Sequence, residues 1–483
     1  MPETDTGGAT RHLRGDVRDR LLARQPTPPG GVPSAPGEPV PVTRAQLAVA
    51  LHERVKGGHA YQLPITIRLH GPLAADLLEE AITALVQRHA VLRTTVRYSG
   101  GGFVQDTAPA APVGLARTTL TALPPKERSD ALHELLAGEV TRGVDPARSP
   151  LLRAHLIALQ PEEHVLLLLT HHLAADGASS DILLRDLGEL YSAARAERSP
   201  MLPELPVSYQ DFALWQRART RSGAWDAQRS YWRERLRGAV PPAGLPYDRP
   251  RPPQVGPRGG TVPWHMPPGP AAGLRLLARE RGTTFFAAVL AGYAALLHRL
   301  EAGDDLVVGV PFDGRRHPDL QPVAGLFATL LPLRLRAEPS MPFSALVDQA
   351  GDAVLGGLAH LDASAEPPDR DAAPPVRITL AMNPATPESE PFEHLRVERM
   401  HLPGASAKFD LGLALVDGPR IVGAFEYASD LWDRETVQGI GSALSAVLSS
   451  ASGRPDTPVG SLPLVDGADR EQVLRWSRAG AYE

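Results

Sequence analysis

The sequence reads Val-Leu-Leu-Leu-Leu-Thr-His-His-Leu-Ala-Ala-Asp-Gly over residues 165–177, an apolar run that ends in two histidines, an aspartate and a glycine. The apolar run predicts a buried strand. An imidazole or carboxylate buried without a partner costs about 1–3 kcal/mol, so polar groups at the end of such a strand are solvated or paired for a reason. A lone histidine here would favour a structural role, whereas this cluster favours chemistry or a metal site.

The residue types of this cluster suit acyl transfer. A neutral imidazole can orient or deprotonate an amine or hydroxyl, and its ordinary pKa of about 6.5 allows this at physiological pH. We take His172 as the candidate because it lies nearest the turn made by Asp176 and Gly177. Gly177 would permit a close backbone approach or a positive φ, and the helix expected after it would offer free N–H groups to a carbonyl oxygen that gains negative charge. Asp176 would either touch substrate or hold the loop by pairing with an arginine.

Metal binding is the main chemical alternative, because two histidines and an acid can ligate zinc or iron. Adjacent histidines on a strand point to opposite faces, so both rarely reach one ion. We therefore expect no metal, with His171 as a supporting residue that faces away from His172.

The composition is that of an ordinary globular protein. The 483 residues are 43% hydrophobic and 22% charged, with a net charge of -5 and no cysteine. The absence of cysteine excludes disulfides, thiolate metal sites and a cysteine nucleophile. The net charge does not favour a nucleic acid or an anionic membrane as partner, no apolar run approaches the roughly 20 residues of a membrane span, and the first residues lack the apolar core of a signal peptide. We expect a cytoplasmic monomer.

The alternation of helix and strand patterns predicts an α/β protein with two lobes. Thr43 is the expected N-cap of a first helix, and three strands are expected between Arg377 and Tyr427. The expected divisions are residues 1–42 as a proline-rich flexible segment, 43–240 as the N-terminal lobe, 241–256 as a proline-rich inter-lobe linker, 257–470 as the C-terminal lobe and 471–483 as a tail.

At residues 171–177 the sequence matches HHxxxDG, the hallmark of the condensation domains of nonribosomal peptide synthetases. The similarity extends over about Thr43 to Leu474. Further segments resemble the family's motifs in the family's order: RHAVLRT (88–94), YQDFALW (209–215), LPYDRPRP (245–252), VGVPFDGR (308–315) and AKFDL (407–411).

This resemblance implies two lobes, each like chloramphenicol acetyltransferase, arranged as a V with a central tunnel. It implies that His172 positions the nucleophile or acts as a base, and that Asp176 is structural, with Arg315 or Arg93 as its ion-pair partner. It also implies no bound cofactor. Substrates would arrive on the phosphopantetheine arms of a donor carrier protein and of an acceptor carrier protein, unless the acceptor is a small-molecule nucleophile.

The remaining motif residues also have simpler interpretations. Tyr209, Phe212 and Trp215 fall at helical spacing, which favours packing over substrate contact. Lys408 and Asp410 would pair with each other across a strand end.

Several departures from the family pattern limit the prediction. The aromatic residue that usually follows Ala45-Gln46 is missing, Thr329 stands where the family has asparagine, and the motif expected near His360 is unrecognisable, so the acceptor side is expected to be unusual. No adenylation or carrier motif is present. If the chain is the whole protein, it is free-standing, although residues 462–476 resemble a linker into an adenylation domain. A non-catalytic recruitment module stays an alternative, as does an epimerisation domain, whose EGHGR motif we do not find.

Overall fold

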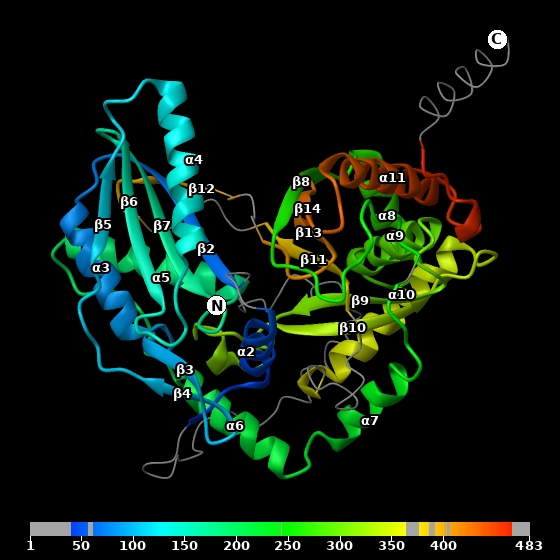
Figure 1. The fold of residues 1–483 in the computed structure, drawn as a ribbon, viewed down its shortest axis with the longest axis horizontal. Helices are drawn as coiled ribbons and strands as arrows, with labels where there is room; N and C mark the ends of the chain where they lie inside the picture. Colours follow the sequence, from blue (N-terminus) through cyan, green and yellow to red (C-terminus); the bar gives the residue numbers. More distant parts are fainter. Residues whose placement is uncertain are drawn as a thin grey trace.

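The structure is a computed structural model that describes residues 40–56, 61–242, 244–363, 376–385, 392–400, 402 and 406–465. The predicted flexible segment therefore lies almost wholly outside the described residues, and the predicted tail, 471–483, lies wholly outside them. Figure 1 shows two lobes, with α6 and α7 passing below both of them.

The N-terminal lobe is built on a five-stranded sheet in the order β12-β2-β7-β6-β5. Its central strand β7 contains the four leucines of the apolar run, all at most 1% exposed. A continuous apolar strand is what burial of both faces of a sheet requires, so the predicted strand is confirmed. The strands of this lobe are β1 (Val40–Pro41), β2 (Gln62–His70), β3 (Thr94–Ser99), β4 (Gly102–Thr107), β5 (Leu115–Thr119), β6 (Leu152–Gln160) and β7 (Glu163–His171). Its helices are α2 (Arg44–Lys56), α3 (Ala75–Arg88), α4 (Pro125–Arg142), α5 (Gly177–Arg195) and α6 (Tyr209–Arg221). The next helix, α7 (Asp226–Arg235), lies under the C-terminal lobe, where Trp232 donates to the carbonyl of His360 (Figure 1).

The C-terminal lobe is built on a six-stranded sheet in the order β10-β9-β11-β13-β14-β8. Its helix α9 is apolar around its circumference, and every residue from Phe285 to Leu297 except Phe286 is buried, as in a helix inside a core. The elements of this lobe are β8 (Gly259–His265), α8 (Pro268–Glu280), α9 (Phe285–Arg299), β9 (Asp305–Phe312), β10 (Thr329–Arg336), α10 (Phe343–Ala359), β11 (Ile378–Pro384), β13 (Leu411–Asp417), β14 (Val422–Ala428) and α11 (Arg434–Gly453).

Strand β12 (Arg396–Met400) crosses from the C-terminal half of the chain into the N-terminal sheet. It pairs antiparallel with β2, with Arg396 opposite His70 and Met400 opposite Thr66 (Figure 1). The prediction of three strands between Arg377 and Tyr427 is therefore wrong, because the described residues there form four. This short edge strand reads Arg-Val-Glu-Arg-Met. Because three of its five residues are charged, it lacks the apolar pattern that predicts a strand.

Candidate functional site

His172 lies in the turn that links β7 to α5. Its backbone N–H donates to the carbonyl of Tyr61 at 2.8 Å, and the N–H groups of Ala174 and Ala175 fold back onto the carbonyl of His171. The side chain of His172 is half-buried. The turn therefore presents this imidazole where the apolar strand has just ended.

Lys408, from the C-terminal half of the chain, meets the imidazole of His172. The Lys408 ammonium lies 2.8 Å from His172 Nε2, and the ring of Tyr61 packs edge-on against the imidazole at 6.1 Å between centroids. Burial, and secondarily the charge of Lys408, lowers the pKa of His172 well below its ordinary value of 6.5. His172 is therefore a neutral imidazole near pH 7, the form that can accept a proton.

His171 faces the opposite way. Its Nε2 lies 2.9 Å from a carboxylate oxygen of Glu53 on α2, and its Nδ1 accepts the N–H of Leu173 at 3.2 Å. Both ring nitrogens of this buried histidine are therefore used inside the protein. Within the described part of the chain, no three histidine, cysteine or acidic residues gather as a metal site would require.

Asp176 is buried and joins the two lobes. It caps α5 by accepting the N–H of Ser179 at 2.9 Å. Its two oxygens pair with Arg315, each at 2.9 Å from a guanidinium nitrogen, and one oxygen also accepts the N–H groups of Phe327 and Ala328. Burial alone would raise its pKa, but Arg315 and these donors hold the pKa below its ordinary value. Asp176 is thus a fixed carboxylate directed at the other lobe.

Arg93, the second arginine considered from the sequence, does not reach Asp176. Its guanidinium donates to the carbonyl of Val86 in α3 at 3.1 Å and to that of Ala108, which follows β4. The expectation that it belongs to the site is corrected accordingly, and Arg315 is the ion-pair partner. The sequence placed both arginines in plausible motifs, and only the packing of the lobes distinguishes them.

Gly177 does not have the positive φ that the sequence allowed for. It is the exposed first residue of α5, it is absent from the glycines with positive φ, and a Cβ atom built on it would meet nothing within 4 Å. What the glycine leaves is open space beside the turn that holds His172.

The family is settled by a match along nearly the whole chain. The model of the condensation domain matches residues 38–474. The chain belongs to the condensation-domain family. The expectation of a two-lobed, chloramphenicol-acetyltransferase-like fold is thereby confirmed.

The relatives are parts of peptide synthetases. The chain is 32% identical over 92% of its length to a protein of the linear gramicidin synthase of Brevibacillus parabrevis, of which it covers 6%. It is 34% identical over 92% of its length to the phosphinothricin tripeptide synthetase PhsC of Streptomyces viridochromogenes, of which it covers 42%. This chain thus covers less than half the length of either of these two relatives. Among solved structures, the X-domain in its complex with OxyB from teicoplanin biosynthesis is 28% identical, with a TM-score of 0.80 and coverage of 92% of this chain and 99% of that one.

A capping box at the start of α2 contacts the turn that carries His172 in this condensation domain. Thr43 and Gln46 exchange hydrogen bonds at the start of α2, which confirms Thr43 as the N-cap, and Gln46 Nε2 also donates to the carbonyl of Leu173 at 2.9 Å. The contact with Leu173 was missed from the sequence, although Thr-x-x-Gln is itself a signal of this cap.

The aromatic residues of the YQDFALW segment pack where the lobes meet. Tyr209, Phe212 and Trp215 are buried, as predicted, and Phe327 from the other lobe lies 4.7 Å from Phe212 between ring centroids. The hydroxyl of Tyr209 also donates to the carbonyl of Leu326 at 2.7 Å, so this residue links the lobes as well as filling space.

Lys408 and Asp410 do not pair with each other. Asp410 is held by Arg251 at 2.8 Å and by the Tyr247 hydroxyl at 3.2 Å, both from the LPYDRPRP segment. Because Asp410 is bound by these two residues, Lys408 does not pair with it and instead contacts His172. The predicted pair is wrong. Side chains two residues apart lie on the same face only in a regular extended strand, and the backbone bends at residues 408–410, just before β13.

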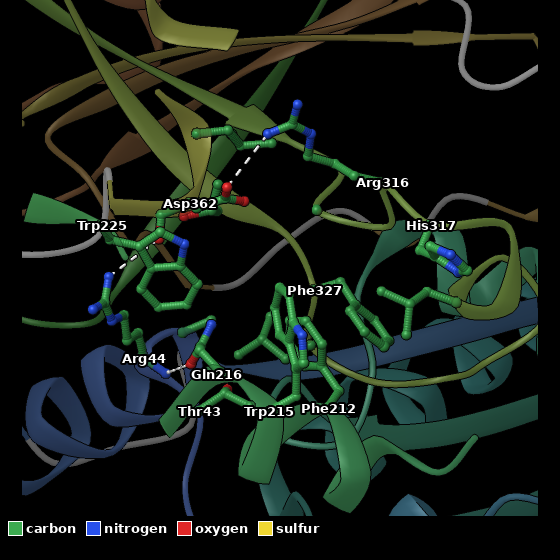
Figure 2. Close-up of a pocket in the computed structure, with 16 residues that line it drawn as sticks. Thr43, Arg44, Phe212, Trp215, Gln216, Trp225, Arg316, His317, Phe327 and Asp362 are labelled. Carbon is green, nitrogen blue, oxygen red and sulfur yellow. Dashed lines mark hydrogen bonds and ion pairs between the residues drawn. The ribbon is translucent and has the colours of Figure 1, made fainter. Parts of the chain in front are cut away.

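A pocket lies between the lobes at the start of α2 (Figure 2). Arg44 stacks over the Trp225 ring at 4.4 Å, and Arg316 lies 3.5 Å from Asp362. Figure 2 shows Phe212, Trp215 and Phe327 grouped on the apolar side of this pocket. Thr329, the residue in place of asparagine, also lines the pocket, as does Asp362, which lies just after His360 where the family's motif is unrecognisable.

Proposed function

We propose that this condensation domain joins a carrier-bound acyl or peptidyl thioester to an amine or hydroxyl acceptor, as part of the biosynthesis of a nonribosomal peptide. The observation that carries the proposal is His172, a neutral imidazole placed between the lobes at the end of a buried strand. Relatives that are peptide synthetases support the same reaction class.

In this reaction the acceptor nitrogen or oxygen attacks the thioester carbonyl carbon. The new C–N or C–O bond forms, the C–S bond breaks, and the acceptor's proton leaves with the sulfur as the thiol of the donor arm. His172 would orient the acceptor through Nε2 and take its proton during attack. Asp176 and Arg315 would hold the turn that carries His172 in place, without touching the substrate.

The partners that this proposal requires are carrier proteins. The donor would arrive on a phosphopantetheine arm, and the acceptor would arrive on a second arm or as a free small molecule. No bound cofactor is needed for the bond exchange. The described residues contain no helix long and apolar enough to cross a membrane.

The test uses the full chain, a donor carrier loaded with candidate acyl groups, and candidate amines and alcohols. Intact-mass analysis of the carrier should show loss of the acyl group together with the amide or ester product. His172→Ala should abolish the product, whereas His133→Ala, at an exposed position on α4, should leave it unchanged. Full condensation by a folded His172→Ala protein would refute the role of His172.

A second candidate function is docking of another protein, because the X-domain it resembles was solved in a complex with OxyB. A wild-type protein that binds a partner enzyme but yields no product with any loaded carrier would favour this candidate. An epimerase would instead lose α-deuterium from the carrier-bound residue without forming a bond.

A further inference from the structure

The contact between Lys408 and His172 occupies the atom that the proposed reaction needs. Lys408 follows His172 by 236 positions and is half-buried, and its ammonium lies 2.8 Å from Nε2 and 5.5 Å from the centroid of the Tyr61 ring. An ammonium has three donors and no acceptor, so in this contact Lys408 donates and Nε2 accepts. The ring proton is then on Nδ1, and the ring also hydrogen bonds to the backbone of Ala175.

The charges around this pair come from both lobes. His171 and Asp176 act on His172 from its own turn, and Glu426 on β14 acts on Lys408. Glu426 is exposed, and Asp176 is already neutralised by Arg315. The cation at Lys408 is therefore the nearest uncompensated charge to the imidazole.

We propose that Lys408 is a positioning residue that occupies the Nε2 lone pair of His172 in the empty enzyme and is displaced by the N–H or O–H of an incoming acceptor. This inference rests on the proposed condensation function. The displaced ammonium stays beside the acceptor, where it disfavours a second cation. Lys408 thereby selects acceptors in their uncharged, nucleophilic form: a neutral amine or a hydroxyl.

The placement of Lys408 supports this role over simple packing. Lys408 lies two residues before Asp410, which Arg251 and Tyr247 anchor, so its backbone is held while its side chain extends to the facing lobe. A lysine that merely filled space would gain by directing its ammonium to solvent, since burying the charge is costly. Here burial lowers the pKa of Lys408, and only the charge of Glu426 opposes the change.

The test compares Lys408→Met, Lys408→Arg and the exposed control Lys126→Met. In the full chain, imidazole NMR of labelled histidine, assigned by subtraction of the His172→Ala spectrum, follows the titration and tautomer of His172. Lys408→Met should raise the pKa of His172 and move the acidic limb of kcat/KM to higher pH by the same amount. Lys408→Arg keeps a cationic donor and should restore both values, while Lys126→Met should change neither.

An unchanged His172 titration and an unchanged acidic limb in Lys408→Met would overturn the inference. If Lys408→Met does not fold, the same comparison in Lys408→Gln decides the matter. The NMR readout does not depend on turnover. A shifted His172 titration in a protein that condenses no acceptor would therefore refute the proposed function and still support the Lys408 contact.

Discussion

The two adjacent histidines have opposite environments because the strand that carries them ends between them. His171 is the last residue of β7, fully buried against Glu53, whereas His172 enters the turn and meets Lys408. One histidine therefore stabilises the fold and the other is available for chemistry. The apolar run and the alternation of a strand predict this asymmetry, and the structure shows which atom of His172 is in use.

Substitution by alanine is expected to have opposite effects on stability at Gly177 and at Gly325. At Gly177 an added Cβ meets nothing within 4 Å, whereas at Gly325 it would overlap the Tyr209 ring. Gly177→Ala should leave the protein as stable or stabilise it by about 0.4–1 kcal/mol, since alanine is the better helix residue. Gly325→Ala should destabilise it by about 1–3 kcal/mol through overpacking.

Thermal unfolding of the two variants beside the wild type measures this difference. Gly177→Trp serves as the companion variant, because a large side chain in the open space beside His172 should reduce condensation with little change in Tm. Equal losses of Tm in Gly177→Ala and Gly325→Ala would contradict the geometry.

Whether a candidate site residue could be predicted from the sequence depends on how far along the chain its partners lie. His172, Asp176 and Gly177 form one short motif, so the sequence alone could single them out as candidates. Arg315 was one of two options, because nothing local distinguishes it from Arg93. The contact of Lys408 with His172 was missed, since a contact between residues 236 positions apart leaves no periodicity in the sequence.

At the scale of elements, a buried charge cluster joins α3 to α5. Asp186 accepts from Arg88 at 2.9 Å and lies 3.0 Å from His89 Nε2, which explains why the RHAVLRT segment carries both residues. Burial opposes ionisation of Asp186, but His89 and the arginines lower its pKa to about 2. Burial lowers the pKa of His89, more than Asp186 raises it.

This cluster predicts that acid destabilises the protein in two steps. A group whose pKa is lower in the folded protein binds its proton more readily when unfolded, so its contribution is complete above the unfolded pKa and is lost as the pH falls. His89 should begin to cost stability below 6.5 and Asp186 below 3.8. The second step amounts to about 2 kcal/mol, at 1.36 kcal/mol per unit of pKa.

Urea unfolding at a series of pH values measures these steps. His89→Gln removes the first titration, so its stability should vary less than that of the wild type between pH 6.5 and pH 5. The pKa of His172 is also lowered in the folded protein, so its titration changes stability in the same direction. Comparing the pH dependence of stability in His172→Ala with that in His172→Ala/His89→Gln therefore isolates the contribution of His89. Parallel pH profiles for the two proteins would show that His89 is not the group responsible.

The helices and long apolar strands were predictable because each has its own periodicity, and the pairing of β12 was not. A strand of five residues with three charges has too little apolar pattern to be found locally, and its partner β2 lies more than three hundred residues earlier in the chain. The consequence is that the two halves of the sequence do not correspond to two independent halves of the structure.

At the scale of the whole molecule, the contacts that tie the lobes together include the β12–β2 pairing, the Asp176–Arg315 ion pair and the Lys408–His172 hydrogen bond. Of these, the ion pair is the most deeply buried, with side chains 1% and 3% exposed. The pair links the turn that carries His172 in one lobe to the loop after β9 in the other.

The neighbouring residues Arg315 and Arg316 allow the contribution of the Asp176–Arg315 ion pair to stability to be measured. Arg315→Met leaves Asp176 as an uncompensated buried charge and should cost about 3–5 kcal/mol, whereas Arg316→Met breaks a more exposed pair with Asp362 and should cost about 0–1 kcal/mol. Guanidinium unfolding followed by tryptophan fluorescence and far-UV circular dichroism gives both the free energy of unfolding and the coincidence of the two probes. The wild type should unfold in one coincident transition because the lobes share a sheet. A loss for Arg315→Met no larger than that for Arg316→Met would show that the lobes are held by β12 and packing alone, and that the ion pair only orients the turn of His172.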